Sequence, residues 1–375
     1  MLRVLRYLTS GESHGKCLNA IIEGIPFGYE LDFDFINSEL ASRQKGHGRG
    51  NRMKIETDKV QFNSGVRFSK TTASPISLTI ENKDWQNWLY PMSVEKLDLS
   101  KFDKKTKAEI LNKIEEKKVT KFRPAHADLA GAQKYGFDDI RYVLERSSAR
   151  ETATRVALGA ICQNILKNYD ILFKSDILAI GGCENKKDFK NVIDKAILDG
   201  DSLGGLIRIT VKNVPVGLGS FVNWDRKLDA RLAGAIASIP AIKSVEFGLG
   251  KDYASLSGSK SHDEIFYKEK YFRKTNASGG IEGGMSNGED IVVTIAMKPI
   301  PTLKKPLNSV EMKTHKKVKA HFERTDSCAV EACSVVARNV CAIVILDAFL
   351  EKFGCDSKKD IDDSYKKYLK RINEI

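Results

Sequence analysis

Residues 328–350 read CAVEACSVVARNVCAIVILDAFL, a segment rich in alanine and valine. A helix that is apolar on every side is either buried in a protein core or spans a membrane. The longest uninterrupted apolar run in this segment is Val340–Leu346. That run is far shorter than the roughly 20 residues that a membrane span requires. The segment therefore predicts a long core helix, and we expect no membrane span.

A second helix is predicted over residues 150–166, where apolar side chains recur at helical spacing around Val156 and Ala160. Ser147 and Ser148 precede it, and serine is a favoured N-cap residue. We expect further helices at 36–42 and 226–238, and strands at 2–8, 18–25, 76–80, 171–180, 206–211 and 291–297. Because strands and helices do not alternate strictly, the pattern favours α+β layers over a doubly wound parallel sheet.

Two segments differ in composition from the rest of the chain. Residues 92–121 are crowded with Lys and Glu, which is typical of a mobile, solvated helical excursion. Residues 356–375 form a polar C-terminal tail, which we expect to fray.

The chain has 375 residues and a net charge of +12, from 61 basic and 49 acidic residues. This surplus favours anionic partners such as nucleic acids, membrane surfaces or phosphorylated metabolites, although solvated lysine faces also produce it. The seven cysteines form no Cys-x-x-Cys pair, which fits reduced thiols better than disulfides or a zinc site. Arg3 and Arg6 interrupt the first apolar stretch, so it lacks the core of a signal peptide and we expect a cytoplasmic protein.

The histidines are the first candidates for chemistry. Three of the six, His14, His47 and His126, fall in loops rich in Gly or Arg. A lone histidine is more often structural, but the small neighbours of His14 let a ligand approach the backbone. His126 lies between Arg123 and Asp128, a cation and a carboxylate that can orient the ring. Such an imidazole is a natural proton donor or acceptor.

Arginines and glycines form two further groups. Seven arginines lie in turns or at helix starts, where the guanidinium group can bind phosphate or carboxylate in a bidentate manner: Arg43, Arg49, Arg52, Arg123, Arg146, Arg150 and Arg324. Residues 276–288 carry five glycines, and we interpret them as a loop whose backbone packs against a flat or phosphorylated ligand. The chain has no P-loop tripeptide, and Gly248-Leu249-Gly250 lacks the third glycine of a dinucleotide fingerprint.

Together these motifs resemble chorismate synthase, in order and over about residues 3–350. The segments that carry the resemblance are Gly11-Glu12-Ser13-His14-Gly15, the Arg43–Ile55 loop, Arg123-Pro124-Ala125-His126-Ala127-Asp128, Arg146-Ser147-Ser148-Ala149-Arg150-Glu151-Thr152, Gly279-Gly280-Ile281-Glu282-Gly283-Gly284 and Arg324-Thr325-Asp326. The resemblance implies a β-α-β sandwich over residues 1–355 as a single catalytic domain, in which 92–121 is a variable region. It also implies a homotetramer.

The resemblance further implies the reaction. That family converts 5-enolpyruvylshikimate 3-phosphate to chorismate and phosphate, the last step of the shikimate pathway, and it uses reduced FMN without net redox change. No reductase domain is visible in the sequence, so we expect a separate flavin reductase, with NADPH as an indirect reductant. We expect no metal, no nucleic acid and no membrane partner.

The motif positions imply roles for individual residues. His14 would serve the departing phosphate as an acid, His126 would lie by the N1 edge of the flavin, and Asp326 would be the base that acts through flavin N5. The implied substrate contacts are Ser13, Arg43, Arg49, Arg52, Arg123, Ser148, Arg150 and Arg324. The implied flavin contacts are Arg146, Ser147, Ser148, Pro240, Ala241, Gly283, Lys298, Pro299, Ile300, Pro301, Thr302 and Arg324.

The sequence also departs from the family pattern. Val143-Leu144-Glu145 replaces the usual glycines, and Glu145 brings a negative charge and bulk near the implied flavin loop. Ala125 stands where glycine is common, and Arg338 stands where glutamate is usual. Two alternatives to the enzyme are a basic nucleic-acid-binding protein and a non-catalytic relative. For Asp326, the alternative role is a helix cap.

Overall fold

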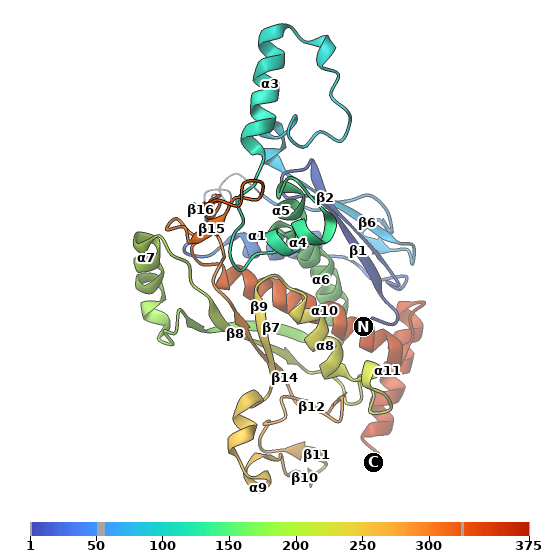
Figure 1. The fold of residues 1–375 in the computed structure, drawn as a ribbon. Coiled ribbons are helices and arrows are strands. Elements are labelled where there is room, and N and C mark those ends of the chain that lie inside the picture. Colours follow the sequence, from blue (N-terminus) through green and yellow to red (C-terminus); the bar gives the residue numbers. More distant parts are fainter. Residues whose placement is uncertain (1, 51–56, 324–325, 375) are drawn as a thin grey trace.

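The computed structural model describes residues 2–50, 57–323 and 326–374. Two four-stranded antiparallel sheets enclose a layer of helices (Figure 1). The first sheet has the strand order β1-β2-β6-β3, with β1 Arg6–Gly11, β2 Cys17–Glu23, β6 Ile76–Glu81 and β3 Gln61–Phe62. The second has the order β7-β8-β14-β9, with β7 Leu172–Ile180, β8 Gly205–Lys212, β14 Ile291–Met297 and β9 Ile242–Phe247. The predicted α+β fold, a β-α-β sandwich, is confirmed.

Three helices make the central layer: α1 Phe33–Gln44, α6 Thr152–Leu166 and α10 Val330–Phe353. Helix α6 contacts β2 and β6 of the first sheet, whereas α10 contacts β7 and β8 of the second. The two helices pack on each other, and α1 packs on both. Burial follows from this arrangement: β14, for example, buries every second side chain, from Ile291 to Met297.

Helix α10 is the long core helix that the sequence predicts. It is long and apolar enough to cross a membrane, but 94% of its most apolar stretch is buried inside the protein. Where α10 meets α6, Gly159 of α6 lies against Asn339 of α10. A Cβ atom at Gly159 would come within 2.3 Å of the Asn339 carbonyl oxygen. The two helices can approach this closely because Gly159 has no side chain.

Asp347 of α10 fastens the N-terminal segment to the core. Its carboxylate is fully buried and accepts hydrogen bonds from the backbone N–H groups of Arg3, Val4 and Leu5. It also pairs with the buried Arg231 guanidinium. These backbone groups are therefore not available to a sheet, and β1 begins at Arg6 rather than at the predicted residue 2.

The two polar segments behave differently. Residues 92–121 contain helix α3 (Lys104–Lys117), which projects from the body of the molecule and buries only Ile110 (Figure 1). The fraying expected of the C-terminal tail is wrong over most of its length, because Lys358–Ile372 forms helix α11. Ile361 of that helix is buried, and Tyr365 and Tyr368 pack against the core.

The remaining elements surround this core. The other α-helices are α4 Asp128–Tyr135, α5 Arg141–Ser147, α7 Phe189–Asp199, α8 Leu228–Ala237 and α9 Gly258–Ser261. Short hairpins pair β4 Val66–Arg67 with β5 Lys70–Thr71, β10 Ile265–Lys268 with β11 Lys270–Arg273, β12 Ile281–Glu282 with β13 Met285–Ser286, and β15 Asn308–Val310 with β16 Lys317–Lys319.

The contact at Gly159 leads to a stability prediction. Helix propensity alone favours alanine over an interior glycine by about 1 kcal/mol. We expect Gly159→Ala to destabilise the protein by about 2 kcal/mol or more, because the new methyl group must force α6 and α10 apart. Gly234→Ala in α8 is the control, since a Cβ there meets nothing within 4 Å. Thermal unfolding should move in opposite directions for the two variants; a gain in stability for Gly159→Ala would contradict the close approach.

Candidate active site

The loop at 11–15 is held in one conformation by its neighbours. Gly11 has φ +92°, and a Cβ there would lie 2.3 Å from the Cys17 carbonyl oxygen. The Asn82 side-chain amide donates to the carbonyl oxygens of Glu12 and Gly15, at 3.1 and 2.7 Å. Ser13 donates its backbone N–H to the Glu145 carbonyl at 3.0 Å. The loop therefore presents Ser13 and His14 on a fixed backbone.

His14 is held by two neighbouring side chains, those of Glu145 and Trp88. Its Nδ1 lies 2.8 Å from Glu145 Oε1, and its backbone N–H donates to Glu145 Oε2 at 2.7 Å. The imidazole stacks on the Trp88 ring with the centroids 3.9 Å apart. The Glu145 carboxylate, which the sequence analysis expects near the implied flavin loop, therefore binds His14.

Arg43 and Arg150 converge on a buried acid that the sequence did not identify, Asp58. Arg150 Nη1 donates to both Asp58 oxygens at 2.7 Å, and Arg43 Nη1 lies 3.6 Å from Asp58 Oδ2. Burial lowers the pKa of Arg43 to about 10, helped by the charges of Arg150 and Arg49 and opposed by Asp58. Arg43 Nη1 makes no hydrogen bond within the described ranges.

The loop after α1 meets the segment before α10. Arg49 Nη1 lies 3.0 Å from Asp326 Oδ2, and Gly50 donates its N–H to Asp326 Oδ1 at 2.6 Å. The alternative role of Asp326 as a helix cap is wrong, because α10 begins at Val330 with Ala329 as its N-cap residue. Arg52 and Arg324, predicted to bind substrate, lie outside the described residues.

Around His126, the structure bears out the expected orienting carboxylate. Asp128 Oδ1 lies 2.5 Å from His126 Nδ1, and Arg123 donates through Nε to Asp128 Oδ2 at 3.0 Å. Arg123 Nη1 also donates to the Thr302 hydroxyl at 3.1 Å. Burial raises the pKa of Asp128, but the hydrogen bond from His126 and the Arg123 charge outweigh it, so the pKa lies below its ordinary value.

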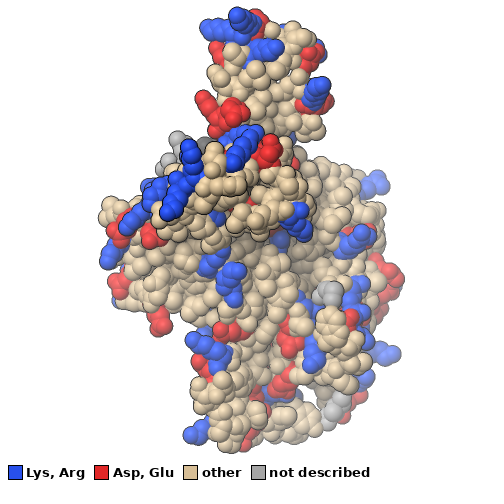
Figure 2. All heavy atoms as spheres, viewed as in Figure 1, with Lys and Arg blue, Asp and Glu red and all other residues tan. Residues whose placement is uncertain are grey.

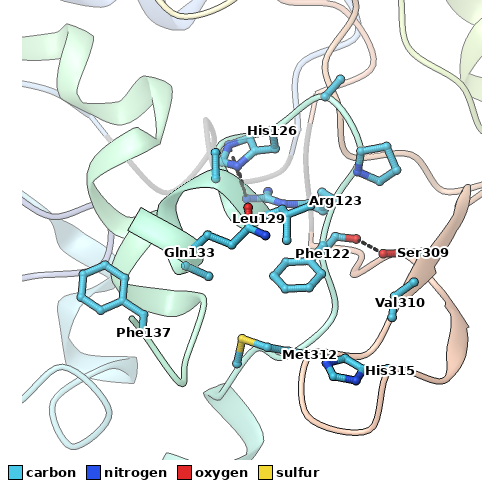
Figure 3. Close-up of a pocket in the computed structure, with 14 residues that line it drawn as sticks. Phe122, Arg123, His126, Leu129, Gln133, Phe137, Ser309, Val310, Met312 and His315 are labelled. Atoms are coloured by element: carbon cyan, nitrogen blue, oxygen red, sulfur yellow. Dashed lines mark hydrogen bonds between the residues drawn. The ribbon is translucent and has the colours of Figure 1, made fainter. Parts of the chain in front are cut away.

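His126 and Arg123 also border an open cavity of about 830 Å³ (Figure 3). Its walls are mainly apolar and come from the 122–137 segment and the β15–β16 hairpin. The larger apolar side chains that line it are Phe122, Leu129, Phe137, Val310 and Met312. A flat, partly apolar ligand fits such walls. The cavity size and the positively charged border therefore fit an aromatic ligand with an anionic group.

Most of the implied flavin contacts lie near the His126 group. Lys298 donates its ammonium group to the Ala125 carbonyl, and its backbone N–H bonds to the Ala241 carbonyl at 2.9 Å. Partial burial lowers the pKa of Lys298, with a smaller contribution from Lys243. Residues 299–302 follow directly, and Pro240 precedes Ala241. Lys298, Ala241 and Thr302 are thus brought to one place by the ends of β14 and α8.

The 146–148 segment is placed differently from its expected helix start. Arg146 and Ser147 end α5, and the Arg146 guanidinium donates to the carbonyl oxygens of Thr9 and Gly11 at 2.8 and 3.3 Å. Ser147 Oγ donates to the Val143 carbonyl at 2.6 Å. Ser148 starts the next turn as its N-cap and donates its hydroxyl to Ser13 Oγ at 3.1 Å. Arg146 and Ser148 therefore both contact the loop at 11–15, Arg146 at Gly11 and Ser148 at Ser13.

The glycine-rich loop has structural contacts of its own, and its expected role as a ligand loop stays a prediction. Gly283 and Gly284 form the turn of the β12–β13 hairpin, and Gly279 packs against the Gly248 backbone, where a Cβ would meet Gly248 N at 2.3 Å. Gly284 accepts a bond from the Leu228 N–H at the start of α8. The residues Pro240 and Ala241 follow the other end of α8, about 15 Å away for a ten-residue helix. The implied flavin contact of Gly283 therefore stays a prediction.

Positive charge also gathers near the cavity. Figure 2 shows Lys and Arg side chains concentrated over the β15–β16 region and the base of the α3 projection. The segment from 304 to 319 contributes six exposed lysines: Lys304, Lys305, Lys313, Lys316, Lys317 and Lys319. Such a field raises the local concentration of anionic ligands.

Sequence reasoning missed three residues of the site, Asp58, Asn82 and Trp88, and for a fourth, Glu145, it missed the partner. Each acts through another side chain or the backbone, and none belongs to a local pattern of histidines, arginines or glycines. The one available signal was Glu145, which stands out as a charge where the family has glycine. Its partner could not be identified, because His14 lies 131 positions away in the sequence.

The backbone at Ala125 adopts a conformation that favours glycine. Its φ is +60°, in the left-handed region, which costs an L-residue about 1–2 kcal/mol. We expect Ala125→Gly to stabilise the protein by about 0.5–1 kcal/mol, since part of that gain is lost to the larger entropy of the unfolded chain. Ala130→Gly is the control, in the exposed interior of α4, and should lose about 1 kcal/mol. Urea unfolding measures both changes, and a loss at residue 125 would disprove strain there.

Comparison with known proteins agrees with this geometry. The family model for chorismate synthase matches residues 5–350. The chain is 51% identical over 373 residues to the chorismate synthase of Caldanaerobacter subterraneus subsp. tengcongensis, covering 99% of this chain and all of that one. It is also 51% identical to that of Thermoanaerobacter pseudethanolicus, covering 97% and 98%. A crystal structure of a chorismate synthase superposes with a TM-score of 0.78 at 36% identity, with both chains fully covered. The chain therefore belongs to the chorismate synthase family and is a chorismate-forming enzyme.

Proposed function

We propose that this enzyme converts 5-enolpyruvylshikimate 3-phosphate to chorismate and phosphate with reduced FMN. The observation that carries the proposal is that His14, His126 and Asp326 are each bound to a charged side chain. Three buried arginines, Arg43, Arg123 and Arg150, add positive charge to these groups. The substrate has a phosphate and two carboxylates, and charge-assisted bonds from guanidinium groups are the strongest that a protein offers such groups.

The arginines have different roles in the proposed binding of the substrate. Arg150 donates to Asp58, to the Asn82 side chain and to the Glu81 carbonyl, and so fixes Asp58 beside Arg43. Arg43 Nη1, buried and without a hydrogen bond in the described part of the chain, remains as a donor for a ligand anion. Arg49 can share its fork between Asp326 and the substrate, as guanidinium groups have five donors. Neutralising the phosphate in a closed site stabilises its departure.

The histidines and Asp326 are the groups that we expect to donate or accept protons. His14 delivers a proton to the departing phosphate, and Asp326 is the base that takes up the proton released in the reaction. Arg49 and the Gly50 N–H each bind one oxygen of Asp326, so the carboxylate is held in one orientation. His126, held by Asp128, orients its ring towards the cofactor side of the site.

Reduced flavin would be held by Lys298, Ala241, Thr302 and His126, beside the apolar cavity. When bound, it supplies the transient electron that the reaction requires. Lys298 offers an ammonium group and a backbone already ordered by the Ala241 carbonyl, so these residues fit a flat ring with anionic groups. Pro240, Pro299, Ile300 and Pro301 belong to the same proposed site, as do Arg146 and Ser147 at its border.

We further propose a homotetramer that works in the cytoplasm with a separate flavin reductase, NADPH being the indirect reductant. Free cysteines at all seven positions fit a reducing compartment. The family membership and the absence of an RRM, KH or zinc signature weigh against a nucleic-acid-binding function. The intact histidines and Asp326 weigh against a non-catalytic relative.

The direct test is an anaerobic assay with purified protein, chemically reduced FMN and 5-enolpyruvylshikimate 3-phosphate. Chorismate and phosphate should appear in equal amounts and only when the flavin is reduced. Product formation with oxidised FMN alone, or none with reduced FMN, would reject the proposal.

Asp326 gives a prediction for one residue. Asp326→Asn keeps the shape and can still accept the Gly50 N–H bond, but it removes the basicity. We expect reduced FMN and substrate still to bind, while turnover falls roughly 10²–10⁴-fold, the range for a general acid–base group. Asp194→Asn, which loses an exposed ion pair to His47, is the matched control and should keep its rate. Anaerobic stopped-flow absorbance of the flavin, run beside product formation, measures both; an unchanged rate for Asp326→Asn would reject the base role.

A further inference from the structure

We propose that Glu145 is the positioning residue of His14, and that it holds the imidazole with its proton on Nδ1 so that any proton given to the substrate leaves from Nε2. The inference rests on the proposed function only in assigning His14 to the departing phosphate. The Glu145–His14 pair itself is observed in the structure.

The contacts between the two residues use both carboxylate oxygens. Oε1 lies 2.8 Å from the ring Nδ1, and Oε2 accepts the backbone N–H of the same residue at 2.7 Å. An ionised carboxylate only accepts hydrogen bonds, so the ring nitrogen facing it must carry the proton. Because one carboxylate binds both the ring and the backbone of His14, it fixes the rotamer as well as the tautomer.

The Glu145 and His14 side chains are both largely buried, which strengthens the hydrogen bond between them. The Glu145 side chain is 3% exposed and that of His14 is 15% exposed. A buried carboxylate needs charge compensation, which Arg141 supplies from one turn earlier on α5, at 3.4 Å. Arg141 also pairs with Glu323 at 2.7 Å and so remains in place.

One face of the His14 ring is covered by an aromatic side chain. Trp88 stacks on His14 with an interplanar angle of 27°, and Lys117 and Arg141 lie over the same indole. Trp88 therefore fixes the plane of the imidazole, and Glu145 fixes its rotation within that plane. Such orientation of an imidazole by a carboxylate is how many enzymes fix the reactive nitrogen.

Glutamine at position 145 would disturb this arrangement in a specific way. The amide has one accepting oxygen, but the carboxylate faces two donors, the ring Nδ1–H and the backbone N–H. If the amide oxygen keeps the backbone bond, its NH₂ group faces Nδ1 and favours the tautomer with the proton on Nε2. The variant should therefore fold normally and carry the wrong His14 tautomer.

A double-mutant cycle tests the proposal. We expect Glu145→Gln to lower kcat roughly 10–100-fold with little change in KM, as for other residues that orient a functional imidazole. In the His14→Ala background the same change should have less than about a 3-fold effect, because its target is gone. Glu351→Gln, which loses ion pairs to Arg231 and Arg226 away from this site, is the control and should act independently of His14. Additive effects of Glu145→Gln and His14→Ala would overturn the proposal.

A second readout is independent of turnover and of flavin. With ¹⁵N-histidine labelling, the His14 signals are identified by their loss in His14→Ala, and the ring ¹⁵N shifts report which nitrogen is protonated. We expect Nδ1–H in the parent and a shift towards Nε2–H in Glu145→Gln. An unchanged tautomer would refute the positioning role even if the enzyme is active. Conversely, a parent without chorismate-forming activity but with this tautomer change would reject the proposed function and leave the pair intact.

Discussion

The crossing of α6 and α10 at Gly159 is the contact on which the rest of the structure depends. It places one helix against each sheet, so that both apolar sheet faces are covered by a single helical layer. It also sets the position of the N-terminal end of α6, where Ser148, Arg150 and Thr152 begin the site. Farther along α10, Asp347 anchors the segment that leads into β1. The glycine and the buried acid therefore locate the two strands that carry the His14 loop.

The site is built from side chains that hold other side chains. Asp58 holds Arg43 and Arg150, Asp128 holds Arg123 and His126, and Glu145 holds His14. In each case a buried carboxylate binds a group that is cationic or can become so, which compensates the cost of burying either alone. Charged donors held in this way are preorganised, and preorganised charge is what lowers the barrier in a desolvated site. The excess of basic residues outside the site raises the local concentration of anionic ligands.

Several features could be predicted from the sequence because they depend on local patterns. The apolar runs indicate α6, α10 and most strands, and the Arg123-x-x-His126-x-Asp128 spacing indicates the orienting carboxylate. Other features could not be predicted. Helix α5 is short and mixed in composition, the glycines at 279–284 serve backbone packing, and the first strand starts late because Asp347, more than 340 positions away, takes its N–H groups.

By itself, the sequence determined the α+β class and the long core helix, and it supplied the candidate residues for anion binding and proton transfer. These follow from periodicity and residue type, which act over a few residues. The tertiary structure alone decided which carboxylate serves which cation or imidazole, because such pairs form between segments that only folding brings together. It also decided that the C-terminal tail is a packed helix, since Ile361, Tyr365 and Tyr368 gain their apolar contacts only from the finished core.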